Sequence, residues 1–307
     1  MARYVYGPVP SRRLGRSLGV DLVPLKTCSF NCIYCQLGPT PATTIQRAEY
    51  APAREVAEEV RQRLAEGVPV DYVTLGGSGE PTLNSAFGDV ARRIKTFADV
   101  PVALLTNGSL FYLPEVRAAC EAVDVVIPDL DAGDEETFQR INRPHAGLTL
   151  DKVVGGLVAL RDEFPGEIWL EVFLVPGVNT SDADVQKLTA LIERIRPDRI
   201  DLNMAVRPPA EDFVRPVPAS RLEEIRAMVG PKARIVADAS GLPHDGEVTA
   251  TEAQVLEMLR RRPCTVEDIA SGMSVPPQEA RKHVQRLLAQ ERIVEQRRGT
   301  RTYYAAR

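Results

Sequence analysis

The chain has 307 residues, of which 44% are hydrophobic and 26% are charged, and its net charge is −4 at neutral pH. This composition excludes a disordered chain, and the length allows one large domain and a small one. No run approaches the roughly 18 consecutive apolar residues of a membrane-spanning helix, and the N-terminus lacks the apolar region of a signal peptide, so we expect a cytoplasmic protein without a membrane partner.

Short apolar segments alternate with amphipathic ones along residues 1–246. The strand candidates are residues 17–23, 71–76, 100–106, 123–129, 168–175 and 199–204, with 234–237 as a seventh. The helix candidates are residues 52–66, 151–161 and 182–195. Because the strands are rich in Val, Ile and Leu, the alternation predicts an α/β fold in which a parallel sheet is covered by helices and curls toward a barrel. The chemistry of such barrels lies at the carboxyl ends of the strands.

Three cysteines at C-x3-C-x2-C spacing follow the first predicted strand. They are Cys28, Cys32 and Cys35. Thiolates so close together are soft ligands for an iron–sulfur cluster or for zinc. A structural zinc site usually has four Cys or His ligands, and the histidines of the chain lie far from the cysteines in sequence. We interpret Cys120 and Cys264 as packing residues.

Glycines and polar residues follow the next three predicted strands. Gly77, Gly79 and Glu80 come after the second, and their glycines allow the backbone to approach a ligand closely. Asn107 ends the third strand, and Asp129 ends the fourth. Taken singly, each of these positions is also explained as an ordinary turn or helix cap.

The cysteine spacing, with Tyr34 before the last cysteine, resembles the radical S-adenosylmethionine (radical SAM) superfamily. The resemblance implies a partial (β/α)6 TIM-like barrel with a 4Fe-4S cluster held by the three cysteines. It also implies SAM as a cofactor that is reductively cleaved to a 5′-deoxyadenosyl radical, with an electron donor such as flavodoxin or ferredoxin. The SAM contacts that it implies are Gly77, Gly79, Glu80, Asn107 and Asp129. Asp131 replaces a lysine of the glycyl-radical activating enzymes, which leaves the role of Asp131 open.

Residues 6–19 also resemble a radical SAM subgroup related to wyosine-base synthase, which modifies transfer RNA. That synthase holds a second cluster on three further cysteines, and no cysteine precedes Cys28 here, so the resemblance implies the core chemistry and not the wyosine reaction. An RNA substrate, similar to transfer RNA, is the expectation. Arg12, Arg13 and Arg16 are then candidate guides for it, or else solvated loop residues.

Two charged residues of later strands remain ambiguous in the sequence. Glu171 lies in an apolar run, where a buried carboxylate needs a partner, so it either meets an arginine inside the barrel or points outward. Arg207 follows the sixth strand and is either a ligand for an anion or an ordinary surface residue.

The last 61 residues differ from the rest in charge, which predicts a second domain. Residues 247–307 contain 11 Arg and Lys against 8 Asp and Glu, a surplus of three positive charges that leaves −7 for residues 1–246. We expect a barrel over residues 1–240, a linker over 241–248 and a domain over 249–307. A capping box at Thr251, two further helix signals and a hairpin with a basic tip predict a winged helix-turn-helix domain.

Nucleic acid, RNA in particular, is the partner expected for residues 249–307. The basic residues expected to meet phosphates are Arg281, Lys282, Arg297, Arg298 and Arg301. The alternatives are radical modification of a peptide or protein gripped by this domain, its use in dimerisation, and a DNA-binding regulator whose cluster senses redox state.

Overall fold

The computed structural model describes residues 4–206, 209–236, 252–273, 275, 277–298 and 301–307. The strands of the main sheet are β1 (Val5–Ser11), β2 (Gly15–Val20), β3 (Tyr72–Leu75), β4 (Val102–Thr106), β5 (Val125–Pro128), β6 (Glu167–Leu174), β7 (Arg199–Met204) and β8 (Ala233–Ile235). The helices among them are α1 (Ala53–Ala65), α2 (Phe87–Lys95), α3 (Pro114–Ala118), α4 (Glu135–Ile141), α5 (Leu150–Glu163), α6 (Asp182–Ile195) and α7 (Ala219–Val229), with 3-10 turns at Pro81–Leu83 and Ala119–Ala122.

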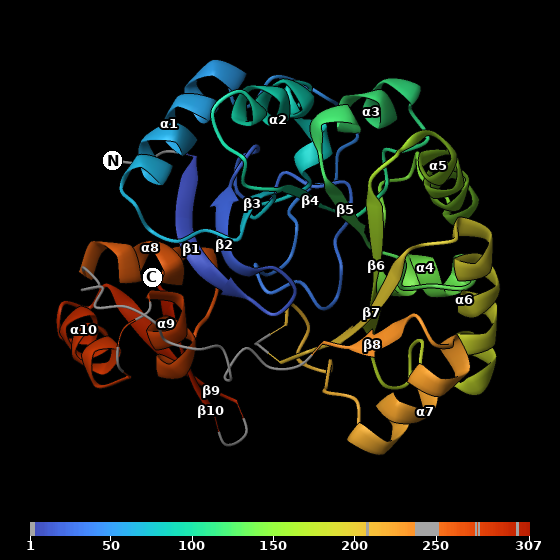
Figure 1. The fold of residues 1–307 in the computed structure, drawn as a ribbon. Coiled ribbons are helices and arrows are strands. Elements are labelled where there is room, and N and C mark those ends of the chain that lie inside the picture. The colour runs from blue at the N-terminus through green and yellow to red at the C-terminus, as the bar shows by residue number, and fades with distance from the viewer. Residues whose placement is uncertain (1–3, 207–208, 237–251, 274, 276, 299–300) are drawn as a thin grey trace.

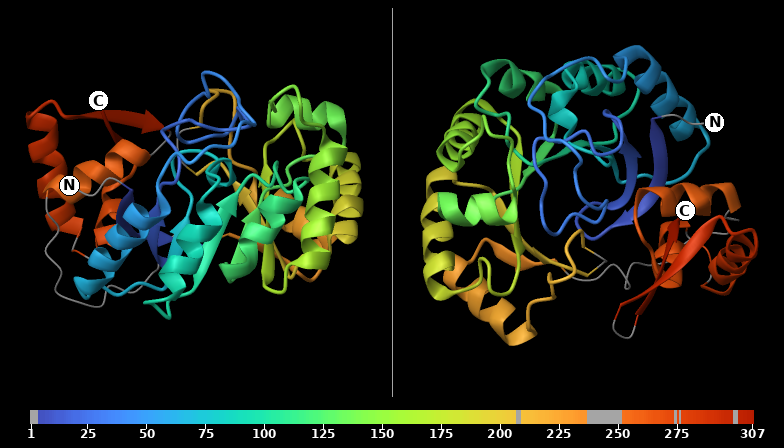
Figure 2. Two further views of the ribbon diagram at one scale, coloured as in Figure 1. Left: turned by 90° about the horizontal axis from the view of Figure 1, so that it is seen from above. Right: turned by 180° about the vertical axis from the view of Figure 1, so that it is seen from behind.

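The eight strands form one sheet in chain order, curled so that the helices surround its outer side (Figure 1). Every pairing from β2 to β8 is parallel, whereas β1 runs antiparallel to β2. All four residues of β5 and all but the first of β6 are buried, as expected for strands of a parallel sheet covered on both faces. The carboxyl ends of β2–β8 therefore share one end of the barrel. The long loop after β2 lies over this end (Figure 2).

Helix α6 shows how local sequence places these elements. Ser181 caps its first turn, and the Asp184 side chain bonds back to the Ser181 backbone, which completes a capping box. Its buried side chains recur at helical spacing, so one face packs on the sheet. They are Val185, Leu188, Ile192 and Ile195.

The predicted strands are all present, but the sheet is larger than the expected six-stranded unit. Strand β1 was not predicted, because Val5–Ser11 contains Gly7 and two prolines, which weaken the sequence signal for a strand. Proline is tolerated there because β1 is the edge of the sheet.

The C-terminal residues form a second unit with its own core. It contains α8 (Glu252–Arg261), α9 (Val266–Met273) and α10 (Pro277–Ala289), followed by the antiparallel pair β9 (Ile293–Arg298) and β10 (Arg301–Ala306). Helices α8 and α9 pack against β1, and Val9 of β1 contacts the C-terminal core. The predicted linker 241–248, Thr251 and the tip of the hairpin lie outside the described residues.

Within the described ranges, none of the helices combines the length and the apolar character that crossing a bilayer requires.

Candidate functional site

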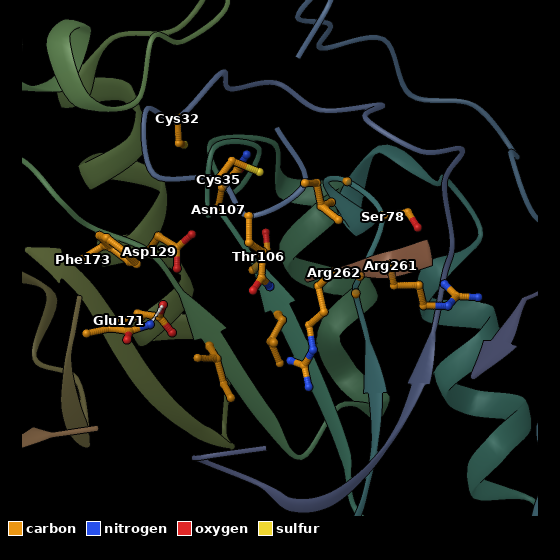
Figure 3. A pocket seen from close by; sticks show the side chains of 18 of the residues that line it. Cys32, Cys35, Ser78, Thr106, Asn107, Asp129, Glu171, Phe173, Arg261 and Arg262 are labelled. Atoms are coloured by element: carbon orange, nitrogen blue, oxygen red, sulfur yellow. Dashed lines mark hydrogen bonds between the residues drawn. The ribbon is translucent and has the colours of Figure 1, made fainter. Parts of the chain in front are cut away.

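A cavity of about 360 Å³ opens at the carboxyl ends of the strands, within the size range of small-molecule sites. Its walls include the three cysteines, the glycine-rich loop after β3, the ends of β4–β7 and the end of α8. Figure 3 shows Cys32 and Cys35 at one side of this cavity and Arg262 at the other, with Thr106 and Asn107 between them. The barrel thus brings together the loops that the sequence had indicated separately.

Each sulfur of the cysteine loop faces a side-chain N–H donor. The pairs are Asn107 Nδ2 with Cys28 Sγ at 3.6 Å, Asn142 Nδ2 with Cys32 Sγ at 3.5 Å, and Lys26 Nζ with Cys35 Sγ at 3.2 Å. Donors of this kind stabilise negative charge on sulfur, as iron–sulfur proteins require. The Lys26 and Asn142 contacts were not predicted, since Asn142 lies 110 residues from Cys32 in sequence.

The thiols of Cys28 and Cys32 are poorly disposed to ionise without a cation. Burial and the Glu80 charge raise the pKa of Cys28 to about 12, and burial raises that of Cys32 well above its usual value. Among the described residues, no three His, Cys, Asp or Glu side chains are grouped tightly enough to hold one metal ion in common. In a cluster each cysteine binds a different iron, so three thiols in one loop, each with an N–H donor, fit a polynuclear iron–sulfur cluster.

Lys26 is expected to raise the reduction potential of a cluster bound here. Its ammonium favours the reduced, more negative state, so Lys26→Met should lower the midpoint potential, by about 59 mV for each factor of ten in stabilisation lost. Lys26 has a φ of 63°, and methionine adds no backbone strain because both residues carry a β-carbon. Potentiometric titration would measure the shift. The exposed Lys152→Met is the matched control, and an unchanged potential in Lys26→Met would contradict this role.

The glycine-rich loop after β3 is hydrogen-bonded to the cysteine loop. Lys26 N donates to Ser78 O at 2.7 Å, and Glu80 N donates to Thr27 O at 2.9 Å. A β-carbon at Gly79 would lie 2.1 Å from Thr27 O, so only glycine fits this close approach. Gly77, with a φ of 159°, is crowded by Asp21 and Tyr6. Both glycines line the cavity. Because they carry no side chain, the glycine-rich loop can lie directly against the neighbouring segments.

Glu80 is the best-anchored acid of the site, and its side chain is almost completely buried. Its Oε1 accepts from Thr82 N at 3.0 Å, Thr82 Oγ1 at 2.5 Å and Thr106 Oγ1 at 2.6 Å. Its Oε2 accepts from Asn107 N at 2.7 Å. Burial raises the pKa of Glu80, and these four donors oppose the rise by stabilising the carboxylate. A carboxylate has about four lone-pair sites divided between two oxygens, so Oε2 keeps acceptor capacity toward the cavity.

Asn107 and Asp129, the other two candidate SAM contacts, both line the cavity, and the Asn107 side chain faces the cysteine loop. Its Nδ2 donates to Ser29 Oγ at 2.8 Å, and its Oδ1 accepts from Ser109 N at 3.0 Å. For Asp129, burial and the charge of Asp131 raise the pKa well above its usual value.

Asp131, whose role the sequence left open, serves to organise the site. Its Oδ2 accepts from Tyr34 Oη at 2.5 Å and from Asn142 Nδ2 at 2.7 Å, and its Oδ1 accepts from Phe173 N at 2.8 Å. The Tyr34 ring stacks on Phe173, with centroids 3.9 Å apart. Asp131 thus ties the cysteine loop to β6.

The sequence left the roles of Glu171 and Arg207 ambiguous, and the structure describes the first of them. Glu171 points into the barrel, where it forms an ion pair with Arg13 and accepts from Asn203 Nδ2 at 2.9 Å. Arg13 is therefore not a solvated loop residue, and its role as a guide for a nucleic acid stays a prediction. Arg16 is bound to Asp71 at 2.8 Å, whereas Arg12 and Arg13 both line the cavity. Arg207 lies outside the described residues.

Comparison with known proteins identifies what this arrangement is similar to. The model of the Radical SAM superfamily matches residues 22–189. A UPF0026 protein from Helicobacter pylori (strain J99) is 33% identical over 313 residues, covering 98% of this chain and 97% of its own length. A protein from Brachyspira hyodysenteriae named GTPase Obg is 35% identical over 295 residues, or 95% of this chain, which spans 43% of that relative's length.

One solved structure supports the fold. The radical SAM methyltransferase from Sphaerobacter thermophilus superposes with a TM-score of 0.54 at 18% identity, covering 71% of this chain and 66% of that one. At this identity the likeness concerns the fold of the chain alone.

Proposed function

We propose a substrate-modifying radical reaction for this chain, which belongs to the radical SAM superfamily and to the UPF0026 family. The cofactors of the superfamily are a 4Fe-4S cluster and SAM. When bound, they supply the reductive cleavage of SAM to methionine and a 5′-deoxyadenosyl radical, which takes a hydrogen atom from a substrate. The observation that carries the proposal is the cavity in which the cysteine loop, the glycine-rich loop and Glu80 meet.

The residues of the chain have distinct roles in this proposal. Cys28, Cys32 and Cys35 hold the cluster, and Glu80 Oε2 accepts from the ammonium group of the SAM methionine. The backbone at Gly77 and Gly79, with Asp129, forms the adjoining wall for the rest of SAM. The loop after β2 covers the barrel end and limits the access of water to the radical.

The direct test is whether the anaerobically reconstituted, reduced protein converts SAM to 5′-deoxyadenosine, measured by chromatography with mass detection. Turnover supports an enzyme. A protein that binds a cluster and duplex DNA but leaves SAM intact would instead be a redox-sensing regulator.

The finer proposal is that the substrate is an RNA, similar to transfer RNA, which the C-terminal unit binds as a winged helix-turn-helix domain. Arg281 and Lys282 on α10 and Arg297 on β9 are exposed, which suits phosphate contacts. Arg298 is less available, because its guanidinium pairs with Asp212 of the barrel at 2.8 Å. The surplus of three positive charges in this unit opposes the repulsion of a polyanion by the rest of the chain.

The double variant Arg281→Gln/Lys282→Gln is expected to weaken RNA binding and to reduce its dependence on salt. Two lost phosphate contacts should lower the slope of log K against log salt by about two. Gel-shift titrations with transfer RNA, bulk RNA and duplex DNA at two salt concentrations would measure this. The control Arg93→Gln/Arg140→Gln removes two exposed charges from α2 and α4 of the barrel. A shift with none of the nucleic acids would favour a peptide or protein substrate.

A further inference from the structure

The C-terminal unit supplies part of the wall of the cavity. Met258, Arg261 and Arg262, at the end of α8, line the same cavity as the cysteines. Every residue that the sequence assigned to the cluster or to SAM lies before residue 210, so this contribution had not been predicted. The site is therefore built from both units.

Contacts on two sides fix α8 in this position. Helices α8 and α9 pack on β1, and Val9 contacts the C-terminal core. From the hairpin strands, Tyr303 Oη donates to Val206 O just after β7, and Arg298 pairs with Asp212. The end of α8 is thus held against the barrel by contacts that are independent of any ligand.

The guanidinium of Arg261 is occupied by contacts with other residues of the protein. Its guanidinium pairs with Asp21 and lies 3.8 Å from the centre of the Tyr6 ring. The Tyr6 hydroxyl in turn donates to Gly76 O at 3.0 Å. Arg261 therefore anchors α8 to the glycine-rich loop.

Arg262, the next residue, has a donor that none of the described residues accepts from. Its Nη2 is buried and has no hydrogen-bond partner among the described residues. A guanidinium stays charged at physiological pH, and a buried, unpaired donor on a charged group is costly. A ligand that offers an anionic oxygen at this point of the cavity would satisfy it.

We propose that Arg262 binds an anionic group of the substrate, a carboxylate or a phosphate, on the side of the cavity away from the cysteines. The inference rests on the proposed function. The group is assigned to the substrate and not to the cluster end of SAM, because Cys32 and Cys35, which would hold the cluster, lie across Thr106 and Asn107 from Arg262 in Figure 3. The C-terminal unit thereby selects the substrate from inside the active site.

The test uses the reconstituted full-length protein saturated with SAM, with inorganic phosphate and acetate as separate probes at constant ionic strength. The thermal unfolding midpoint is followed against the concentration of each anion. At least one anion should stabilise the wild-type protein. Arg262→Gln should raise the half-saturating concentration tenfold or more, and Arg262→Lys should recover part of the loss. Arg260→Gln is the control, because Arg260 lies on the same helix and is exposed.

Each outcome is decisive. The anion that stabilises the protein identifies the group, and loss of the effect in Arg262→Gln alone supports the proposal. No effect of either anion on the wild-type protein, or an equal effect on Arg262→Gln, would overturn it. A tenfold loss of SAM affinity in Arg262→Gln would also overturn it, since the guanidinium would then hold the cofactor. A wild-type protein that makes no 5′-deoxyadenosine would refute the proposed function and not this inference.

Discussion

The triple variant Cys28→Ala/Cys32→Ala/Cys35→Ala is expected to bind no cluster and to form no 5′-deoxyadenosine. The three thiols lie in one loop, line one cavity and each face a side-chain N–H donor, so they form one ligand set. Anaerobic reconstitution should give about four irons per wild-type chain, with visible charge-transfer absorption, and both should be lost in the variant. Iron analysis, spectroscopy and product detection measure the three effects.

The control for this experiment is Cys120→Ala/Cys264→Ala. Both of these cysteines are fully buried in the hydrophobic cores, one in each unit of the chain. Their loss creates small cavities and should lower stability while leaving the iron content unchanged. Iron retained by the triple variant, or one zinc per wild-type chain, would show that the loop does not hold a cluster.

Glu80→Gln is expected to weaken SAM binding about tenfold or more while leaving the cluster spectrum unchanged. A charge-assisted hydrogen bond to the methionine ammonium contributes roughly 1.5–3 kcal/mol, and glutamine removes the charge. The amide also places an N–H group against Asn107 N or against the donors from Thr82 and Thr106. Isothermal titration of the reconstituted protein with SAM would measure the loss.

The exposed Glu121→Gln is the matched control, because it makes the same chemical change outside the cavity. Thr106→Val separates charge from position, since it removes one donor to Glu80 and keeps the carboxylate. Its effect on SAM affinity should be smaller than that of Glu80→Gln. If Glu80→Gln binds SAM as tightly as the wild-type protein, Glu80 only supports the loop.

The parallel part of the fold was predictable because each strand carries its own signal. The prediction for residues 199–204 matches β7 (Arg199–Met204), and that for 182–195 matches α6 (Asp182–Ile195). Both are short segments bounded by turn formers with strong apolar patterns. Strand β1 was missed because its stability comes from pairing with β2 and from cover by α8 and α9, which a local pattern does not reveal.

The place of a site residue was predictable where that residue follows a strand end. It was not predictable where the contact joins segments that are distant in sequence. Cys28 and Glu80 lie in motifs and at strand ends, so chain order alone indicates their place. The ion pair between Arg13 and Glu171 joins two segments on opposite sides of the barrel, and Arg262 comes from a different unit. Such contacts depend on how distant segments come together in the folded chain, which the local pattern of one sequence does not reveal.

The packing of α8 and α9 on β1 has a consequence for biosynthesis. Strand β1 is the edge of the sheet, and an uncovered edge strand can pair with other chains. The helices that cover it begin only at Glu252, so residues 12–251 must be synthesised first. At about 5–20 residues per second, this interval lasts on the order of 10–50 s. Throughout it the nascent chain exposes Val9 and the edge of β1, so we expect β1 to be a segment that chaperones protect and through which prematurely terminated chains aggregate.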